Sequence, residues 1–228
     1  GDRRDPTSHI SENFRRACGA IGASGREVVQ VYQVHGGDVR VFRAGDASRD
    51  LGAGPGGETI DYKADALVTD DFTRVLAGRV ADCTPVLLAS TDGRIVAAVH
   101  AGWRGVAAGV AGAAAAAMRR LGAGEIVAAI GPCISVDAFE VGPEVVSAMR
   151  TALGEHAAIR EHADPGARGT GKAMVDLKEC LRRQLVAGGV REVDVLPGCT
   201  FARREDYFSH RRERGHTGRM AALIGTRC

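Results

Sequence analysis

The sequence predicts a single domain of mixed α and β structure, in which helices pack on the faces of β-sheets. Strand-like and helix-like segments alternate along the chain, and no internal repeat divides it. Of the 228 residues, 45% are hydrophobic, which is enough to fill one substantial core. We therefore expect residues 1–228 to form one domain of the α/β class.

Nine short apolar segments are predicted to be strands. In chain order they are Val28–Val34, Val39–Arg43, Ala66–Thr69, Val75–Val80, Val86–Ala89, Ile95–His100, Ile126–Ile130, Glu192–Val195 and Met220–Ile224. Apolar runs of this kind carry His35, Cys83 or His100 at one end. Loops over the ends of rigid strands often carry chemistry, so these three positions are the first candidates for a functional site.

Four longer segments are predicted to be helices, namely Glu12–Ile21, Gly105–Leu121, Pro143–Leu153 and Ala173–Ala187. The alanine run 113–117 supports the second helix, because alanine has the highest helix propensity. Pro143 suits the first turn of the third helix, and the glycine pair 188–189 suits the end of the fourth.

Two segments rich in glycine and other turn-forming residues, Gly52–Gly57 and His162–Gly171, are predicted to be loops. The strands beside them are too short to be stable without partners elsewhere in the chain. We therefore expect both segments to lie on the surface of one domain, and neither to link two domains.

Charge and hydropathy argue against two classes of partner. The formal net charge is +2, with 30 basic and 28 acidic residues, which gives no sign of a nucleic acid or an anionic membrane as partner. No apolar stretch approaches the roughly 20 residues of a membrane span, and the first residues are polar. We expect a cytoplasmic protein, and the sequence predicts no particular oligomeric state.

The six cysteines are too sparse for a disulfide scaffold, and no two of them form a CxxC pair. We expect thiols, most of them in the core, and only Cys83 has neighbours that suggest another role. One thiolate and two imidazoles make a tetrahedral Zn²⁺ site with an open fourth position. His35, Cys83 and His100 are 48 and 17 positions apart, a spacing that suits ligands from several strand ends and does not suit a zinc finger.

The surroundings of these residues strengthen the zinc hypothesis. A single histidine or cysteine is more often an ordinary buried or surface residue. Here Asp82 precedes Cys83 and can orient a ligand or accept a proton. Gly102 and Gly105 allow close backbone approach beside His100. The sequence therefore predicts a metal site of the catalytic type.

The chain resembles the laccase-domain family, which is also called the polyphenol oxidase family and has been redescribed as purine nucleoside phosphorylases. The matching segments are QVHGGDV (33–39), DALVTD (65–70), ADCTPVLL (81–88), VHAGWRG (99–105), IGPCIS (130–135) and CTFARREDYFSHRRERGHTGRMAALI (199–224). They keep the order of the family and span nearly the whole chain. His210 departs from the pattern, because the family often has tyrosine there.

The resemblance implies a single α/β/β/α layered domain with buried mixed β-sheets. It also implies a zinc site on His35, Cys83 and His100, the residues that the spacing argument selects. The implied reaction is phosphorolysis of adenosine, inosine or S-methyl-5′-thioadenosine to a base and a ribose 1-phosphate. Adenosine deamination is implied as a second activity, so the expected partners are a purine nucleoside and inorganic phosphate.

Phosphorolysis needs a phosphate ion held against the anomeric carbon, which is a task for arginines and backbone donors. The candidate substrate-binding residues are Gln33, Arg104, Arg211 and Arg212, where Gln33 would bond to a purine edge. Deamination needs a water molecule activated by a metal, together with a proton shuttle. The candidate catalytic residues are Cys83, His100 and Asp82, with Asp82 as the shuttle.

Three other interpretations stay open. In the first, Cys83 is the nucleophile of a metal-free hydrolase and His100 is its base. In the second, Cu²⁺ displaces zinc in vitro and gives weak phenol oxidation, although seven histidines without a His-x-His pair do not suit a true multicopper oxidase. In the third, the protein is a non-catalytic binding module and a fourth protein ligand closes a structural zinc site.

Overall fold

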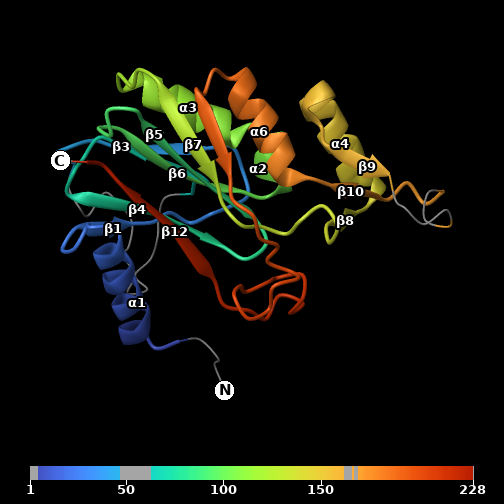
Figure 1. Ribbon diagram of the computed structural model, residues 1–228, viewed down its shortest axis with the longest axis horizontal. Coiled ribbons are helices and arrows are strands. Elements are labelled where there is room, and N and C mark those ends of the chain that lie inside the picture. The colour runs from blue at the N-terminus through green and yellow to red at the C-terminus, as the bar shows by residue number, and fades with distance from the viewer. Residues whose placement is uncertain (1–4, 47–62, 162–165, 167–168, 228) are drawn as a thin grey trace.

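The computed structural model describes residues 5–46, 63–161, 166 and 169–227, and Figure 1 shows its arrangement in four layers. The predicted loop Gly52–Gly57 and part of the predicted loop at 162–171 lie outside the described residues. Helices cover one face of a six-stranded sheet, a three-stranded sheet packs on its other face, and a further helix covers the outside of that second sheet. The predicted α/β/β/α arrangement is confirmed.

The central sheet is mixed. Its strands, in spatial order, are β11 (Glu192–Val195), β7 (Ile126–Ile130), β5 (Thr84–Ser90), β6 (Val96–Ala101), β3 (Ala66–Thr69) and β2 (Val39–Phe42). The two outer pairs, β11 with β7 and β2 with β3, are parallel, and the inner pairs are antiparallel. The inner strands β3, β5 and β6 are almost wholly buried, because both faces of this sheet are covered.

The second sheet has the order β1 (Glu27–Val29), β4 (Arg74–Val80) and β12 (Met220–Gly225). Side chains alternate between the two faces of a strand, so β6 sends Val96 and Ala98 toward this second sheet. Leu67 of β3 and Leu76 of β4 meet them in the buried layer between the sheets. This layer fixes the distance between the two sheets, and the candidate site lies at the strand ends beside it.

Three helices cover the other face of the central sheet, namely α2 (Trp103–Ala107), α3 (Val110–Arg120) and α6 (Leu177–Ala187). Met118 and Leu181 are fully buried in the resulting core. The N-terminal helix α1 (Thr7–Ala20) lies on the opposite side of the molecule, where Cys18 packs against Val75. Among the described residues, no helix is long and apolar enough to span a bilayer.

A smaller unit extends from one end of the central layers (Figure 1). It consists of helix α4 (Pro143–Leu153), the 3₁₀ turn η2 (Gly154–His156), and a sheet in the order β8 (Glu140–Val141), β10 (Ala173–Val175) and β9 (Ile159–Glu161). Helix α4 has the predicted bounds, and proline occupies its first turn as expected. The strands of this unit are two or three residues long and give no recognisable pattern in the sequence.

Some predicted boundaries are wrong. The predicted helix Ala173–Ala187 begins instead at Leu177, because residues 173–175 pair as β10 and Asp176 caps the helix by accepting a hydrogen bond from the Glu179 N–H. The predicted helix Gly105–Leu121 is two helices, separated at Gly109, whose φ of +73° is incompatible with a continuous helix. Helix α1 starts five residues before the predicted Glu12, and β1 ends at Val29 instead of Val34.

Candidate metal centre

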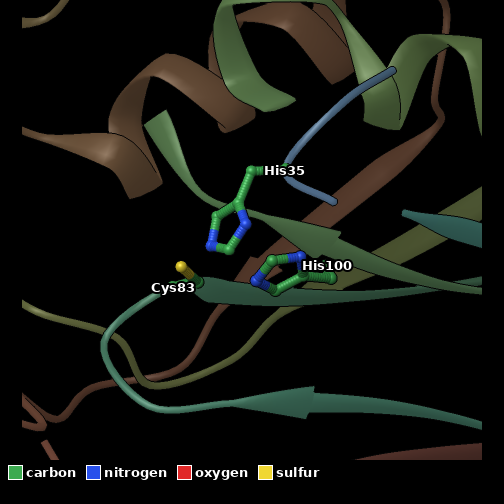
Figure 2. A group of neighbouring side chains, drawn as sticks. All are labelled: His35, Cys83 and His100. Atoms are coloured by element: carbon green, nitrogen blue, oxygen red, sulfur yellow. The ribbon is translucent and has the colours of Figure 1, made fainter. Parts of the chain in front are cut away.

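His35, Cys83 and His100 come together at one end of the central sheet (Figure 2). One ligand atom from each residue lies within 4.8 Å of the others. The two imidazole centroids are 4.8 Å apart and the rings are nearly perpendicular, at 80°. His100 is buried, Cys83 is half-buried and His35 is exposed, so the group is reached from solvent on the side of His35. Figure 2 shows that the three side chains point toward one another.

The strand register explains why Cys83 and His100 meet. Cys83 directly precedes β5, and His100 is the penultimate residue of β6. The two strands are antiparallel, with Pro85 opposite His100, so the start of β5 lies beside the end of β6. His35 reaches the same place from the segment between β1 and β2, where its φ of +62° makes it one of three described non-glycine residues with a positive φ. Such backbone conformations often occur at functional sites, because the surrounding structure must hold them.

Asp65, which is not among the predicted site residues, is hydrogen-bonded to both histidines. Its Oδ1 is 2.8 Å from Nδ1 of His100, and its carboxylate also accepts a hydrogen bond from the backbone N–H of His35 at 2.9 Å. Burial by itself raises the pKa of Asp65, but the hydrogen bonds from His100, Gly36 and His35 outweigh burial and lower it. The signal in the sequence was the DALVTD motif, which begins at this residue.

The space between the ligands suits a single ion. A Cβ atom on Gly102 would lie 3.0 Å from Sγ of Cys83 and 3.0 Å from Cδ2 of His35, so a larger residue would press the two ligands apart. One sulfur and two imidazole nitrogens are the donors that Zn²⁺ and copper ions favour. The residues present therefore fit a transition-metal ion, with His35, Cys83 and His100 as its protein ligands.

The surroundings shift the pKa values of Cys83 and His35 in opposite directions. Burial, assisted by the charge of Asp82, raises the pKa of the Cys83 thiol to about 12. Burial also lowers the pKa of His35, and the charges of His100, Arg104 and His210 lower it further, against the opposing charge of Asp65. His35 is therefore favoured in the neutral form that binds a metal. Cys83 becomes a thiolate at neutral pH only if a cation compensates its charge.

Asp82, the predicted proton shuttle, uses its carboxylate to hold the C-terminal segment. It accepts hydrogen bonds from Thr200 Oγ1 at 2.6 Å, Ser209 Oγ at 3.0 Å and the Arg211 N–H at 2.6 Å. The residue is buried and has a φ of +81°. These contacts give Asp82 an anchoring role next to Cys83, and the role of shuttle stays a prediction.

Gln33, predicted to bond to a purine edge, is engaged with the second sheet. Its amide nitrogen donates to the carbonyl of Arg79 at 2.7 Å, and its amide oxygen accepts from the N–H of Arg79 at 2.8 Å. The side chain thus forms hydrogen bonds with the backbone of β4 at a position that β1 does not reach. Both hydrogen-bonding atoms of the amide are occupied, so Gln33 helps to hold the segment that carries His35.

The three predicted substrate-binding arginines lie in different surroundings. Arg104 is exposed, with its guanidinium carbon 4.4 Å from the ring centroid of Trp103, and it forms no ion pair with any described carboxylate. The guanidinium of Arg211 donates to the carbonyl of Glu140 at 3.1 Å, and its backbone N–H donates to the carboxylate of Asp82, next to Cys83, at 2.6 Å. The charge of Arg104 also lowers the pKa of His35, one of the metal-ligand candidates.

The side chain of Arg212 forms its hydrogen bonds within its own segment of the chain. Its guanidinium donates to the carbonyls of Thr200 at 2.6 Å, Phe201 at 2.9 Å and Tyr207 at 2.7 Å, and to the carboxylate of Glu213 at 2.8 Å. These contacts hold a stretch of the chain with no described helix or strand between β11 and β12. The predicted contact of Arg212 with phosphate would require it to give up some of these bonds.

Comparison with known proteins gives the family. The family described as "Multi-copper polyphenol oxidoreductase laccase" matches residues 1–227. The chain belongs to this family. The suspected resemblance to the laccase-domain family is therefore confirmed, and the match includes all three metal-ligand candidates.

Relatives of this chain are named for an activity other than the oxidation in the family description. The chain is 35% identical to "Purine nucleoside phosphorylase" of Deinococcus radiodurans, over 98% of this chain and 80% of the relative. It is 33% identical to "Purine nucleoside phosphorylase YlmD" of Geobacillus stearothermophilus, over 98% of this chain and 81% of the relative. The names of these relatives support an enzyme of the phosphorylase kind.

Solved structures confirm the fold. The "hypothetical protein YfiH" of Bacillus licheniformis superposes with a TM-score of 0.84 at 29% identity, covering 98% of this chain and 83% of the other. The structure of YlmD from Geobacillus stearothermophilus superposes with a TM-score of 0.83 at 33% identity, with 98% and 82% covered. The layered architecture is thus shared with known members of the family.

Proposed function

We propose that this chain is a zinc-dependent purine nucleoside phosphorylase, with adenosine deamination as a second activity of the same site. The observation that carries the proposal is the convergence of His35, Cys83 and His100 within 4.8 Å. A set of one thiolate and two imidazoles leaves one position of a tetrahedral ion free for substrate. The names of the relatives supply the reaction class.

In phosphorolysis, an oxygen of inorganic phosphate forms a bond to C1′ of the ribose while the bond from C1′ to the purine nitrogen breaks. The electron pair of the broken bond leaves with the purine, which takes up a proton. Arg104 is exposed beside His35 and has no carboxylate partner among the described residues, so its charge is available to an incoming phosphate dianion. A bound zinc ion would supply Lewis-acid stabilisation of charge that develops on the substrate.

Adenosine deamination replaces the amino group of the purine by an oxygen from water and releases ammonia. The reaction calls for the same Lewis acid, and for a proton carrier between water and the leaving group. His210, whose charge acts on His35, and Asp82, which directly precedes Cys83, are titratable residues close to the metal-ligand candidates. Three donors occupy the carboxylate of Asp82, so acting as the proton carrier would require it to give up at least one of these hydrogen bonds.

The metal-free hydrolase is the weaker alternative. A cysteine nucleophile needs a lowered pKa, whereas burial and Asp82 raise the pKa of Cys83 to about 12. A structural zinc site is also less well supported, since among the described residues the cluster consists of three ligands and not four. The raised pKa of Cys83 and the number of ligands both favour a metal centre with an open position.

The decisive experiment is a product assay with the full chain. Protein stripped by a chelator and reloaded with Zn²⁺ is incubated with adenosine, inosine or S-methyl-5′-thioadenosine, with and without phosphate, and the products are separated by chromatography. We expect free base only when phosphate and zinc are present, and inosine from adenosine without phosphate. The Cys83→Ala variant should lose both activities. If zinc-loaded protein releases no base from any of the three nucleosides, the phosphorylase proposal fails.

A parallel arm tests the identity of the metal. Elemental analysis of the purified protein should find close to one zinc ion per chain, and His35→Ala should remove it. Reloading with Cu²⁺ should support at most weak phenol oxidation, because one mononuclear site lacks the several copper centres of a laccase. Phenol oxidation that exceeds nucleoside turnover would favour the oxidase interpretation.

A further inference from the structure

We propose that Asp65 is the positioning residue of the metal centre, and that its single carboxylate fixes both histidine ligands at once. The inference rests on the proposed metal site and goes beyond it by assigning the residue that organises the ligands before the metal arrives. It is carried by four hydrogen bonds to one side chain that is fully shielded from solvent.

The first bond determines which nitrogen of His100 can bind a metal. Nδ1 of His100 lies 2.8 Å from Oδ1 of Asp65, and both side chains are buried, at 5% and 0% exposure. A carboxylate accepts hydrogen bonds and does not donate them, so Nδ1 must carry the proton. The lone pair of the neutral ring is then on Nε2. Asp65 thereby selects the tautomer of His100 that presents Nε2 to the metal.

The other three bonds hold the turn that carries His35. The backbone N–H groups of Val34, His35 and Gly36 all donate to the Asp65 carboxylate, at 3.2, 2.9 and 2.6 Å. Successive N–H groups that converge in this way form a concave binding site for an anion. The negative charge of Asp65 occupies it, and the positive φ of His35 is maintained by these bonds. The position of the His35 ring is therefore set by Asp65 through the backbone.

The backbone of Asp65 is itself tied to the same elements. Its carbonyl accepts from the N–H of His100 at 2.8 Å, and its own N–H donates to the carbonyl of Asp38 at 3.0 Å. Asp65 directly precedes β3, which pairs with β6. Because side chain and main chain contact His100 together, the carboxylate cannot move away without disturbing the end of β6.

Asparagine is the sharpest substitution, because it keeps the shape of the side chain and removes one acceptor. Oδ1 of Asp65 serves His100 and His35, and Oδ2 serves Val34 and Gly36. In either orientation of the asparagine amide, its NH₂ group would face two N–H donors. Asp65→Asn should therefore lose either the hydrogen bond that fixes the tautomer of His100 or the hydrogen bonds that hold the turn at His35.

The test measures the affinity of the full chain for Zn²⁺ by competition with a chromophoric chelator. We expect Asp65→Asn to bind zinc roughly 10- to 100-fold more weakly than the wild-type chain, the usual cost of losing a partner of a ligand. The matched control is Asp71→Asn, since Asp71 is also buried and also accepts hydrogen bonds, from the N–H and hydroxyl of Thr73, but lies outside the metal cluster. Asp71→Asn should keep the wild-type affinity.

A second measurement keeps the proposal testable if Asp65→Asn does not fold. In wild-type protein labelled with ¹⁵N at histidine, two-bond correlation spectra identify the protonated nitrogen of each ring. We expect His100 to carry its proton on Nδ1 with and without zinc, and zinc to shift Nε2. Zinc bound at Nδ1, or equal zinc affinity of Asp65→Asn and wild type, would overturn the role of Asp65 alone. A wild-type chain that binds no zinc would overturn the metal proposal as well.

Discussion

The backbone N–H of Arg211 donates a 2.6 Å hydrogen bond to Oδ2 of Asp82, a residue 129 positions earlier in the chain. Asp82 adjoins the ligand Cys83, and Arg211 lies in the segment before β12. With the bonds from Thr200 and Ser209, this contact fixes a segment without described helix or strand structure against the metal centre. The position of His210, which lies between two residues bonded to Asp82, follows from this anchor.

We expect Asp82→Ala to lower the free energy of unfolding by about 1–3 kcal/mol, because it leaves the N–H of Arg211 and two hydroxyl groups without their acceptor. Chemical denaturation would measure the loss, and limited proteolysis should show faster cleavage between residues 199 and 219. Asp137→Ala is the control: Asp137 is 76% exposed, and its loss should change the stability by less than about 0.5 kcal/mol. Unchanged stability of Asp82→Ala would contradict the anchoring role.

Replacing Gly102 by alanine should weaken zinc binding roughly tenfold by displacing Cys83 or His35. The φ of Gly102 is −74°, which alanine adopts without strain, so the effect would come from the Cβ contacts at 3.0 Å. Competition with a chromophoric chelator measures the zinc affinity of the variant.

Gly112→Ala in α3 is the matched control for this substitution, since a Cβ there meets nothing within 4 Å. It should leave zinc affinity unchanged and raise stability by about 0.5–1 kcal/mol through helix propensity. Wild-type affinity in Gly102→Ala would show that the ligands do not need the space above this glycine.

Zinc affinity should rise with pH by roughly tenfold per unit between about pH 7 and 9. Burial holds the pKa of the Cys83 thiol at about 12, so zinc must displace a proton that becomes easier to remove as the pH rises. The pKa of His35 is lowered, so its ring is already neutral there and adds no further dependence. Competition titrations in a pH series measure the slope. An affinity that does not change above pH 7 would indicate a thiolate of low pKa, as the hydrolase interpretation requires.

Two arginines should respond in opposite ways to truncation. Arg104→Ala should raise the KM for phosphate several-fold and leave stability within about 0.5 kcal/mol of wild type, because the side chain is exposed. Arg212→Ala should instead lower the free energy of unfolding by about 2 kcal/mol or more, because three backbone carbonyls and Glu213 lose a charged donor. Steady-state kinetics and denaturation distinguish them; a stable Arg212→Ala with a raised KM would restore Arg212 as a phosphate ligand.

Much of the metal centre could be predicted from the sequence. His35, Cys83 and His100 are residues of recognisable chemistry at the ends of apolar runs, and strand ends of one sheet necessarily gather at its edge. The helix Pro143–Leu153 was equally predictable, because proline marks its start and the apolar residues repeat with helical spacing. These signals are local, and the tertiary structure did not need to be known to find them.

The partners of these residues could not be predicted in the same way. Gln33 bonds to the backbone of Arg79 and Asp82 bonds to Thr200, contacts that span 46 and 118 positions. A side chain that bonds to a distant backbone leaves no periodic pattern around it. The short strand Ala173–Val175 was mistaken for the start of a helix for a related reason, since its pairing partners β8 and β9 lie outside the local sequence.

The sequence by itself determined the family, the alternation of strands and helices, and the chemical identity of the three ligands, because each depends on residue type and spacing along the chain. Only the tertiary structure decided how those ligands are held. The carboxylate of Asp65 meets His100 35 positions away and the N–H of His35 30 positions away, and it can do so only where β3 and β6 lie side by side. Hydrogen bonds depend on distance and direction in space, and the folded sheet alone sets both.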